Sequence, residues 1–275
     1  MANIQMTCYS NSLRVTVEFN VILPQPVSHE IGLNSGSKRK KYPVLWLLHG
    51  ATDDHTTWQR RTSIERYAAP LGLAIVMPNG HLSSYVNMAH GEKFYDFISK
   101  ELPELVYKIF PVSDKREDNF IAGNSMGGFG AMMIGINNPD RYAAIGCFSA
   151  AARHGNQSET HKASGLFSDS IQNQFDYILF GGEDTTNTLW DTYYMADKNK
   201  NRKNLPRIFH TIGKGDFLLE EARSTRDFFQ NIPGNPYQYV YEEHEGVHGW
   251  DYWDAHITDF LDFLNLKQPV EKIAN

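Results

Sequence analysis

The chain has 275 residues, of which 41% are hydrophobic and 21% are charged, and this globular composition excludes a wholly disordered protein. Its 26 Lys and Arg residues against 32 Asp and Glu residues give a net charge of −6, which argues against binding nucleic acid by neutralising phosphates. Only 2 cysteines, Cys8 and Cys147, are present, too few for a disulfide scaffold or a Cys-based zinc site.

The N-terminal residues 1–17 contain no apolar core of signal-peptide length. No other segment approaches the ~20 consecutive apolar residues that a membrane-spanning helix needs. We therefore expect a soluble, cytoplasmic protein with no membrane partner.

The first predicted strand covers Leu13–Val21, where apolar and polar residues alternate strictly. A period of two is typical of a strand with one face in water, so we expect an edge strand or an antiparallel hairpin here. The polar segment Gly32–Lys41 follows and ends in a run of basic residues, Lys38 to Lys41. In an acidic protein we interpret this segment as a solvated hairpin loop rather than a nucleic-acid patch.

Short apolar runs then recur along the chain, most of them ending near Gly, Pro, Asn or Ser. Continuous apolar runs are typical of strands that are covered on both faces, as in a parallel sheet. The further predicted strands are residues 44–48, 73–77, 120–122, 143–148, 177–180, 208–212 and 237–241.

Helix-like segments separate several of these strands. The predicted helices are residues 94–110, 126–137 and 253–264, the last with apolar residues at spacings of three and four. Strands that alternate with helices predict an α/β fold with a mostly parallel central sheet, an antiparallel N-terminal hairpin and helices on both faces. No repeat or domain-scale linker is present, so we expect a single domain over residues 1–275, with a small cap or lid insertion around 152–173.

A G-x-S-x-G pattern lies between the predicted strand 120–122 and the predicted helix 126–137, with its serine at Ser125. In a tight strand-to-helix turn, side chains two residues before and after the serine would collide, and Gly123 and Gly127 remove that collision. The N-terminus of the following helix would direct its N–H groups toward the serine, where negative charge develops during acyl transfer. We therefore predict that Ser125 is a nucleophile.

A nucleophilic serine needs a histidine base, which follows it in chain order on this kind of fold. Of the 11 histidines, His244 and His248 both follow the last predicted strand. We favour His248 as the base, because it lies just before the C-terminal helix and is followed by Gly249. We interpret His244 as a surface residue at the strand end.

The acid that orients the histidine is expected in a loop after a later strand, and two residues fit that position. Asp184 follows the predicted strand 177–180, and Asp216 follows the predicted strand 208–212. We favour Asp216, because only one helix and one strand then separate it from His248. Asp184 is interpreted as a turn or capping residue.

An oxyanion hole needs two backbone N–H donors. One donor is expected from the residue after the nucleophile, Met126, and the other from the loop after the strand 44–48. Gly50 permits an unusual backbone angle in that loop, so we predict that the N–H of Ala51 is the second donor.

Together the segments LLHGATDDHTTW, AGNSMGGFGAM, GKGDFL and HGWDYW, with ELP at 101–103, resemble the esterase D family of the α/β-hydrolases. The resemblance runs in order from about Leu13 to Leu264, nearly the whole chain. It implies the α/β-hydrolase fold and serine esterase activity. Carried over by position, it implies a catalytic triad and two oxyanion donors, namely Ser125, Asp216 and His248, with Ala51 and Met126.

Two departures from the family's S-formylglutathione hydrolases indicate a different branch. Those enzymes usually have a Ser-Gly-Leu-Thr-Cys type of oxyanion loop and a His before the nucleophile, whereas this chain has HGATD at 49–53 and Asn124. This pattern resembles the bacterial tributyrin-esterase-like and feruloyl-acetyl esterase branch. We therefore predict hydrolysis of short-chain acyl esters, including acetylated or feruloylated sugars, through an acyl-enzyme. The alternatives are an S-formylglutathione hydrolase and a non-catalytic binding protein on the same fold.

Two tryptophans beside the motifs, Trp58 and Trp250, are candidates for the substrate pocket, whereas Trp253 fits the core-facing stripe of the last helix. Neither an HExxH motif nor paired histidine spacing occurs, so we expect no metal and no other cofactor. The expected partner is a small-molecule ester, and the sequence leaves the formation of a homo-oligomer open.

Overall fold

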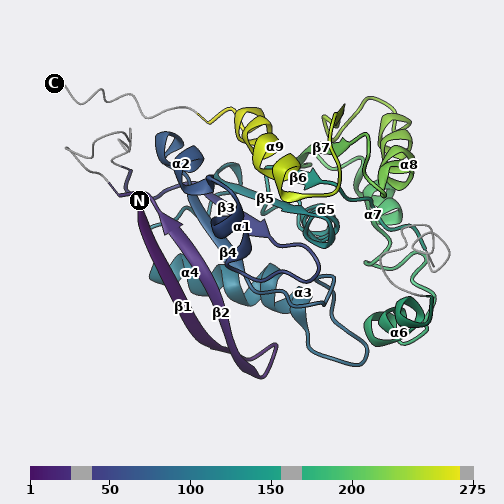
Figure 1. Ribbon diagram of the computed structural model, residues 1–275, viewed down its shortest axis with the longest axis horizontal. Coiled ribbons are helices and arrows are strands. Elements are labelled where there is room, and N and C mark those ends of the chain that lie inside the picture. Colours follow the sequence, from purple (N-terminus) through teal and green to yellow (C-terminus); the bar gives the residue numbers. More distant parts are fainter. Residues whose placement is uncertain (26–38, 156–168, 267–275) are drawn as a thin grey trace.

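Eight strands form one continuous sheet within residues 1–25, 39–155 and 169–266, the part of the chain that this computed structural model describes (Figure 1). The strands are β1 (Ala2–Ser10), β2 (Val15–Leu23), β3 (Val44–Leu48), β4 (Ala74–Pro78), β5 (Asn119–Asn124), β6 (Ala144–Phe148), β7 (Arg207–Gly213) and β8 (Val240–His244). The α-helices are α1 (Thr57–Arg61), α2 (Ile64–Ala68), α3 (Phe94–Asp96), α4 (Leu102–Ile109), α5 (Met126–Asn137), α6 (Asp169–Phe180), α7 (Thr192–Asn199), α8 (Leu219–Gln230) and α9 (Trp250–Phe263).

The strand order across the sheet is β1-β2-β4-β3-β5-β6-β7-β8. The six strands β4, β3, β5, β6, β7 and β8 run parallel to one another. In contrast, β2 is antiparallel to both β1 and β4. The predicted mostly parallel sheet with an antiparallel N-terminal hairpin is therefore confirmed.

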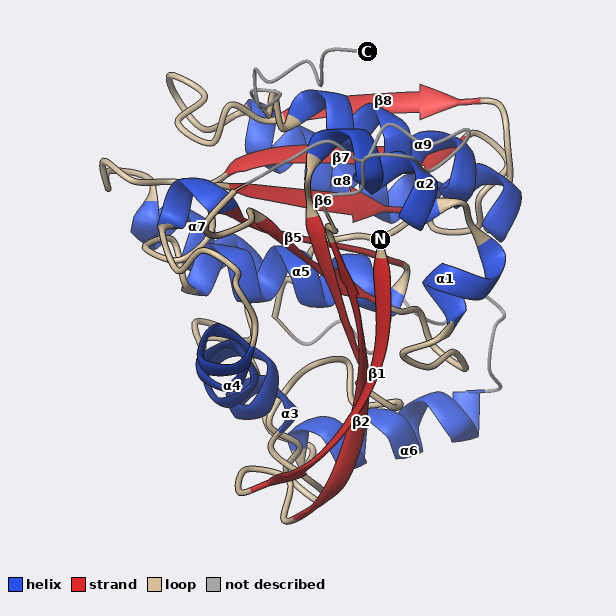
Figure 2. Ribbon diagram, turned by 90° about the vertical axis from the view of Figure 1, so that its left-hand side faces the viewer, coloured by secondary structure: helices blue, strands red, loops and turns tan. Residues whose placement is uncertain are grey.

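Each face of the sheet has its own hydrophobic core. Every residue of β3, β4 and β6 is buried, as their uninterrupted apolar runs predict. One core contains buried residues of α4, α5 and α7, and the other contains buried residues of α1, α2 and α9. Figure 2 shows these two sets of helices on opposite sides of the sheet.

The N-terminal hairpin differs from the prediction. Its first strand, β1, was not predicted, and the alternating segment 13–21 belongs to β2, which begins at Val15. The connection from β2 to β3 is not a hairpin loop, because β4 lies between these two strands in the sheet. The core of that predicted loop, residues 32–38, lies outside the described residues.

The predicted strand 177–180 is wrong, since these residues form the last turn of α6. A short apolar run does not by itself distinguish a strand from one side of a helix. Here Leu179 and Phe180 are buried whereas Tyr177 is exposed, and Gly181 ends the helix with φ 69°.

The last strand is also shifted, from the predicted 237–241 to 240–244. The predicted insertion around 152–173 falls largely on residues outside the described ranges and stays a prediction.

None of the helices in the described ranges has the length and apolar character that crossing a bilayer requires.

A buried histidine on β7 couples the stability of the sheet to pH. His210 is fully buried; its Nε2–H donates to the carbonyl of Ala150 at 2.8 Å, and its Nδ1 accepts from the hydroxyl of Tyr239 at 2.7 Å. Burial disfavours the imidazolium and lowers the pKa of His210 from 6.5 to about 4.

Between pH 6.5 and about 4 the unfolded chain therefore binds a proton at His210 that the folded chain does not. We expect the free energy of unfolding to fall as the pH falls through this window, by up to about 1.4 kcal/mol per pH unit from this residue. The variant H210Q should show a flatter dependence in urea titrations at several pH values. Parallel stability curves for the two proteins would contradict the assignment.

Candidate active site

Ser125 lies at the junction of β5 and α5 in an unusual backbone conformation, with φ 53° and ψ −121°. Such a conformation is strained for a residue other than glycine and persists only where neighbouring structure holds it. The Ser125 N–H donates to the carbonyl of Phe148 in β6 at 2.8 Å, and its carbonyl accepts from the Phe129 N–H at 3.0 Å. The turn is thus fixed on both sides of the serine.

Two glycines give the turn the room that it needs. A Cβ at Gly123 would lie 2.5 Å from the carbonyl carbon of Gly127. A Cβ at Gly127 would overlap the carbonyl oxygen of Leu48 at the end of β3. Because the obstacles are backbone atoms, no side-chain rotation can relieve either clash.

A continuous chain of hydrogen bonds joins Ser125 to a histidine and an aspartate. The Ser125 hydroxyl lies 2.9 Å from Nε2 of His248, and His248 Nδ1 lies 3.0 Å from both carboxylate oxygens of Asp216. Since a carboxylate only accepts, Nδ1–H is the donor to Asp216, which leaves Nε2 free to accept the serine proton. Asp216 is buried and also accepts the Leu218 N–H at 2.9 Å, so its orientation is fixed.

The structure brings together the residues that the sequence favoured and separates the rejected alternatives from them. Asp216 lies in the connection between β7 and α8, and His248 lies between β8 and α9. The rejected acid, Asp184, is in an exposed turn where its carboxylate accepts the N–H of Thr186 at 2.9 Å. The rejected base, His244, is the last residue of β8, and its Nε2 lies 3.1 Å from a carboxylate oxygen of Glu242.

Aromatic rings surround the imidazole of His248. The ring of Phe217 lies 4.3 Å from it, centroid to centroid, and the ring of Trp253 meets it edge-on at 5.2 Å. The His248 side chain is only 13% exposed. These contacts leave the imidazole little freedom to rotate away from Ser125.

The two candidate pocket tryptophans have different surroundings. Trp58 is buried, packs edge-on against Trp250 and donates its indole N–H to the carbonyl of Leu48 at 2.9 Å. Trp250 is partly exposed and also packs against Trp253. Trp250 is therefore partly accessible to solvent, whereas Trp58 is not.

A histidine whose role the sequence did not indicate holds the loop that follows β3. His49 is buried; its Nδ1–H donates to the carbonyl of Gly50 at 2.8 Å, and its Nε2 accepts the Gly80 N–H at 2.8 Å. Because Nε2 accepts a hydrogen bond, the ring must be neutral, and burial lowers the pKa of His49 to about 4. The hydroxyl of Tyr85 donates to the carbonyl of His49 at 2.9 Å, a contact that no sequence pattern indicates.

Two polar side chains, Asn124 and Asp53, lie close to Gly50 in this loop. Asn124, directly before the serine, is buried, and neither atom of its amide has a hydrogen-bond partner among the described residues. A Cβ at Gly50 would lie 2.9 Å from the Asn124 amide nitrogen and 3.4 Å from a carboxylate oxygen of Asp53. Partial burial, together with the charge of Asp54, raises the pKa of Asp53 to about 6.

Because its folded-state pKa is raised from 3.8 to about 6, ionisation of Asp53 destabilises the fold as the pH rises through that window. The variant D53N cannot ionise. We expect it to become more stable than the wild type by about 1 kcal/mol above pH 7, a figure reduced for solvent screening at a half-buried site. The gain should be absent at pH 4. Melting temperatures of the wild type and D53N, measured at pH 4 and above pH 7, test this prediction. An equal difference in melting temperature between the two proteins at both pH values would refute it.

Comparisons with known proteins show what this chain is similar to. The family model described as "Putative esterase" matches residues 10–264. The chain is 27% identical to an acetyl esterase of Caldicellulosiruptor saccharolyticus, over 96% of this chain and 98% of that protein.

Two solved structures from Staphylococcus aureus are each 34% identical to this chain, and each match covers 96% of it and 98% of the other chain. One is the fluorophosphonate-binding serine hydrolase FphF, with a TM-score of 0.80. The other is the S-formylglutathione hydrolase FrmB, with a TM-score of 0.78.

Proposed function

Because the chain belongs to the esterase family, whose model spans residues 10–264, we propose that Ser125, Asp216 and His248 are its catalytic triad. The protein is a serine carboxylic ester hydrolase with the α/β-hydrolase fold. The observation that carries the proposal is the uninterrupted hydrogen-bond chain from the Ser125 hydroxyl through His248 to Asp216.

The reaction begins when the Ser125 oxygen attacks the ester carbonyl and its proton passes to Nε2 of His248. The carbonyl oxygen becomes an oxyanion in the tetrahedral intermediate. His248 then gives the proton to the leaving alkoxide, which departs as an alcohol and leaves an acyl group on Ser125. A water molecule repeats the same sequence and releases the carboxylic acid.

Asp216 stabilises the imidazolium that forms during each half-reaction. Both oxygens of its buried carboxylate lie 3.0 Å from Nδ1 of His248 and accept the Nδ1–H. This contact holds the ring in the tautomer that accepts the serine proton. Phe217 and Trp253 confine the ring to this orientation. The proton therefore moves along a path that is set before substrate binds.

We assign the oxyanion hole to the backbone N–H groups of Ala51 and Met126. Met126 is the first residue of α5, where helix N–H groups have no partner within the helix and the helix dipole favours negative charge. Ala51 follows Gly50 in the loop that His49 and Tyr85 hold in place. Donors fixed in this way need no reorganisation as charge develops, and one such donor contributes about 3–4 kcal/mol to transition-state stabilisation.

For the substrate we favour a short-chain acyl ester, such as an acetylated or feruloylated sugar, with Trp250 forming part of the pocket and Trp58 supporting it. The similarity to an acetyl esterase over nearly the full length of both chains supports this choice. The second candidate, S-formylglutathione, is supported by the 34% identity to FrmB. A cytoplasmic location and the absence of nucleic-acid and membrane partners stay predictions, and the formation of a homo-oligomer stays open.

The triad assignment is tested by single substitutions. We expect S125A to lower kcat by a factor on the order of 10⁶, and D216N by about 10⁴, because the Asn leaves the imidazole in the wrong tautomer. The matched control is D184N, which changes the other sequence-selected acid in its exposed turn. If D184N lost activity while D216N kept it, the assignment of the acid would be wrong.

The substrate class is tested with p-nitrophenyl esters from acetate to decanoate, together with methyl ferulate and S-formylglutathione. We expect kcat/KM to be highest for acetate and butyrate, to decrease for longer chains and to vanish in S125A. A kcat/KM for S-formylglutathione well above that for every ester would instead select the thioesterase alternative. Unchanged hydrolysis of any substrate by S125A would mean that another group performs the reaction.

A further inference from the structure

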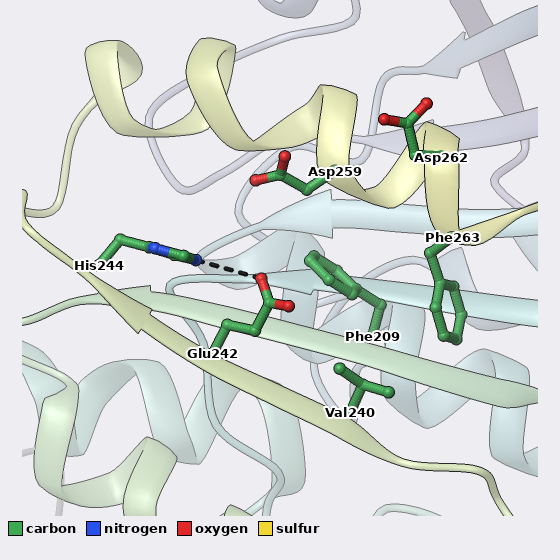
Figure 3. Close-up of a pocket in the computed structure, with 7 residues that line it drawn as sticks. All are labelled: Phe209, Val240, Glu242, His244, Asp259, Asp262 and Phe263. Atoms are coloured by element: carbon green, nitrogen blue, oxygen red, sulfur yellow. Dashed lines mark hydrogen bonds and ion pairs between the residues drawn. The ribbon is translucent and has the colours of Figure 1, made fainter.

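A group of histidines and carboxylates on β8 and α9 has no part in the triad. Glu242 and His244 are two residues apart on β8, so their side chains share one face of the strand. His256 and Asp259 are three residues apart on α9, so they share one face of the helix. Figure 3 shows Glu242 and His244 on the strand with Asp259 above them on the helix.

Three of these side chains, Glu242, His244 and Asp259, border an open cavity of about 310 Å³ at the edge of the sheet. Its apolar lining comes from Phe209, Val240 and Phe263, and its polar lining includes Glu242, His244, Asp259 and Asp262. Polar groups from both the strand and the helix, beside apolar side chains, give a bound ion both ligands and partial shelter from water.

Three of the side chains are close enough to share one ion. Within the described residues, one ligand atom each of His244, His256 and Asp259 lies within 4.8 Å of the other two. The rings of His244 and His256 stack at 4.4 Å, and Nδ1 of His256 lies 2.7 Å from a carboxylate oxygen of Asp259. Glu242, hydrogen-bonded to His244 at 3.1 Å, can orient that imidazole or act as a fourth ligand.

We propose that His244, His256 and Asp259 bind one divalent transition-metal ion of the Zn²⁺ class. Two imidazoles and a carboxylate are a typical donor set for zinc, whereas Mg²⁺ and Ca²⁺ prefer oxygen ligands alone. Metal–ligand bonds of about 2.0–2.2 Å require the ligand atoms to approach one another, and one stacked ring must turn so that the two nitrogen lone pairs converge. All three side chains are partly exposed, and His244, whose side chain is 41% exposed, has room for its ring to turn.

Such an ion joins the end of β8 to α9 across residues 245–249, the segment that contains His248. The end of β8 and this segment are both connected to the loop that leads to Asp216. The Lys214 N–H donates to the carbonyl of His244 at 2.8 Å, and the Gly215 N–H donates to the carbonyl of Gly246 at 2.8 Å. The ion thus stabilises the backbone that positions two of the triad residues. It takes no part in bond making or breaking.

The test is Zn²⁺ binding measured by titration calorimetry on chelator-treated protein. We expect one ion per wild-type chain, and a loss of affinity of at least about 10-fold in both H244Q and H256Q. The matched control is D262N, which changes an acid that lines the same cavity but is not one of the three ligands. This variant should bind Zn²⁺ within about 2-fold of the wild type.

Two outcomes would overturn the proposal. One is equal Zn²⁺ binding by the wild type, H244Q and H256Q. The other is binding that survives in H256Q but is lost in H248Q, which would place the ion at the triad histidine.

Thermal unfolding adds a readout that does not depend on activity, since a ligand that binds the folded state raises the melting temperature. Zn²⁺ should raise it in the wild type and D262N but not in H256Q, whose metal-free melting temperature shows whether that variant is folded.

Discussion

The backbone conformation of Ser125 is the constraint on which the rest of the site depends. With φ at 53°, the residue stores strain on the order of 1–3 kcal/mol, and the strand β5, the helix α5 and the end of β3 must all meet there. This meeting is sterically allowed only because Gly123 and Gly127 have no side chains. The two backbone hydrogen bonds of Ser125 and the buried parallel sheet on either side of it offset the strain.

The parallel sheet converts this local turn into a complete site. Since β3, β5, β7 and β8 point the same way, the loops after them lie at one edge of the sheet, which is where ligands bind in open α/β folds. Ser125 and His248 are 123 positions apart in the chain, yet they lie 2.9 Å apart. The precision of that contact comes from the sheet register together with the packing of Phe217 and Trp253 on the imidazole.

The environments of three histidines explain their different roles. His49 and His210 are buried without a carboxylate in hydrogen-bond contact, so desolvation lowers the pKa of each to about 4 and both remain neutral structural groups. His248 instead contacts the buried carboxylate of Asp216, which in the proposed mechanism stabilises the imidazolium. Residue type alone is therefore a poor guide to function, whereas the nearest polar partner of each ring is informative.

Local sequence patterns were sufficient for the serine turn, for the choice of Asp216 and His248 as the side chains that lie beside it, and for the buried strands. Glycine spacing and apolar runs reflect short-range sterics and burial. The same kind of pattern failed at 177–180, where residues Leu179 and Phe180 are buried on one side of a helix and not in a strand. It also overlooked β1, which forms only by pairing with β2. Only the tertiary structure brought His244 beside His256 and fixed the loop at His49, since these contacts join separate elements whose distance in space no local spacing encodes.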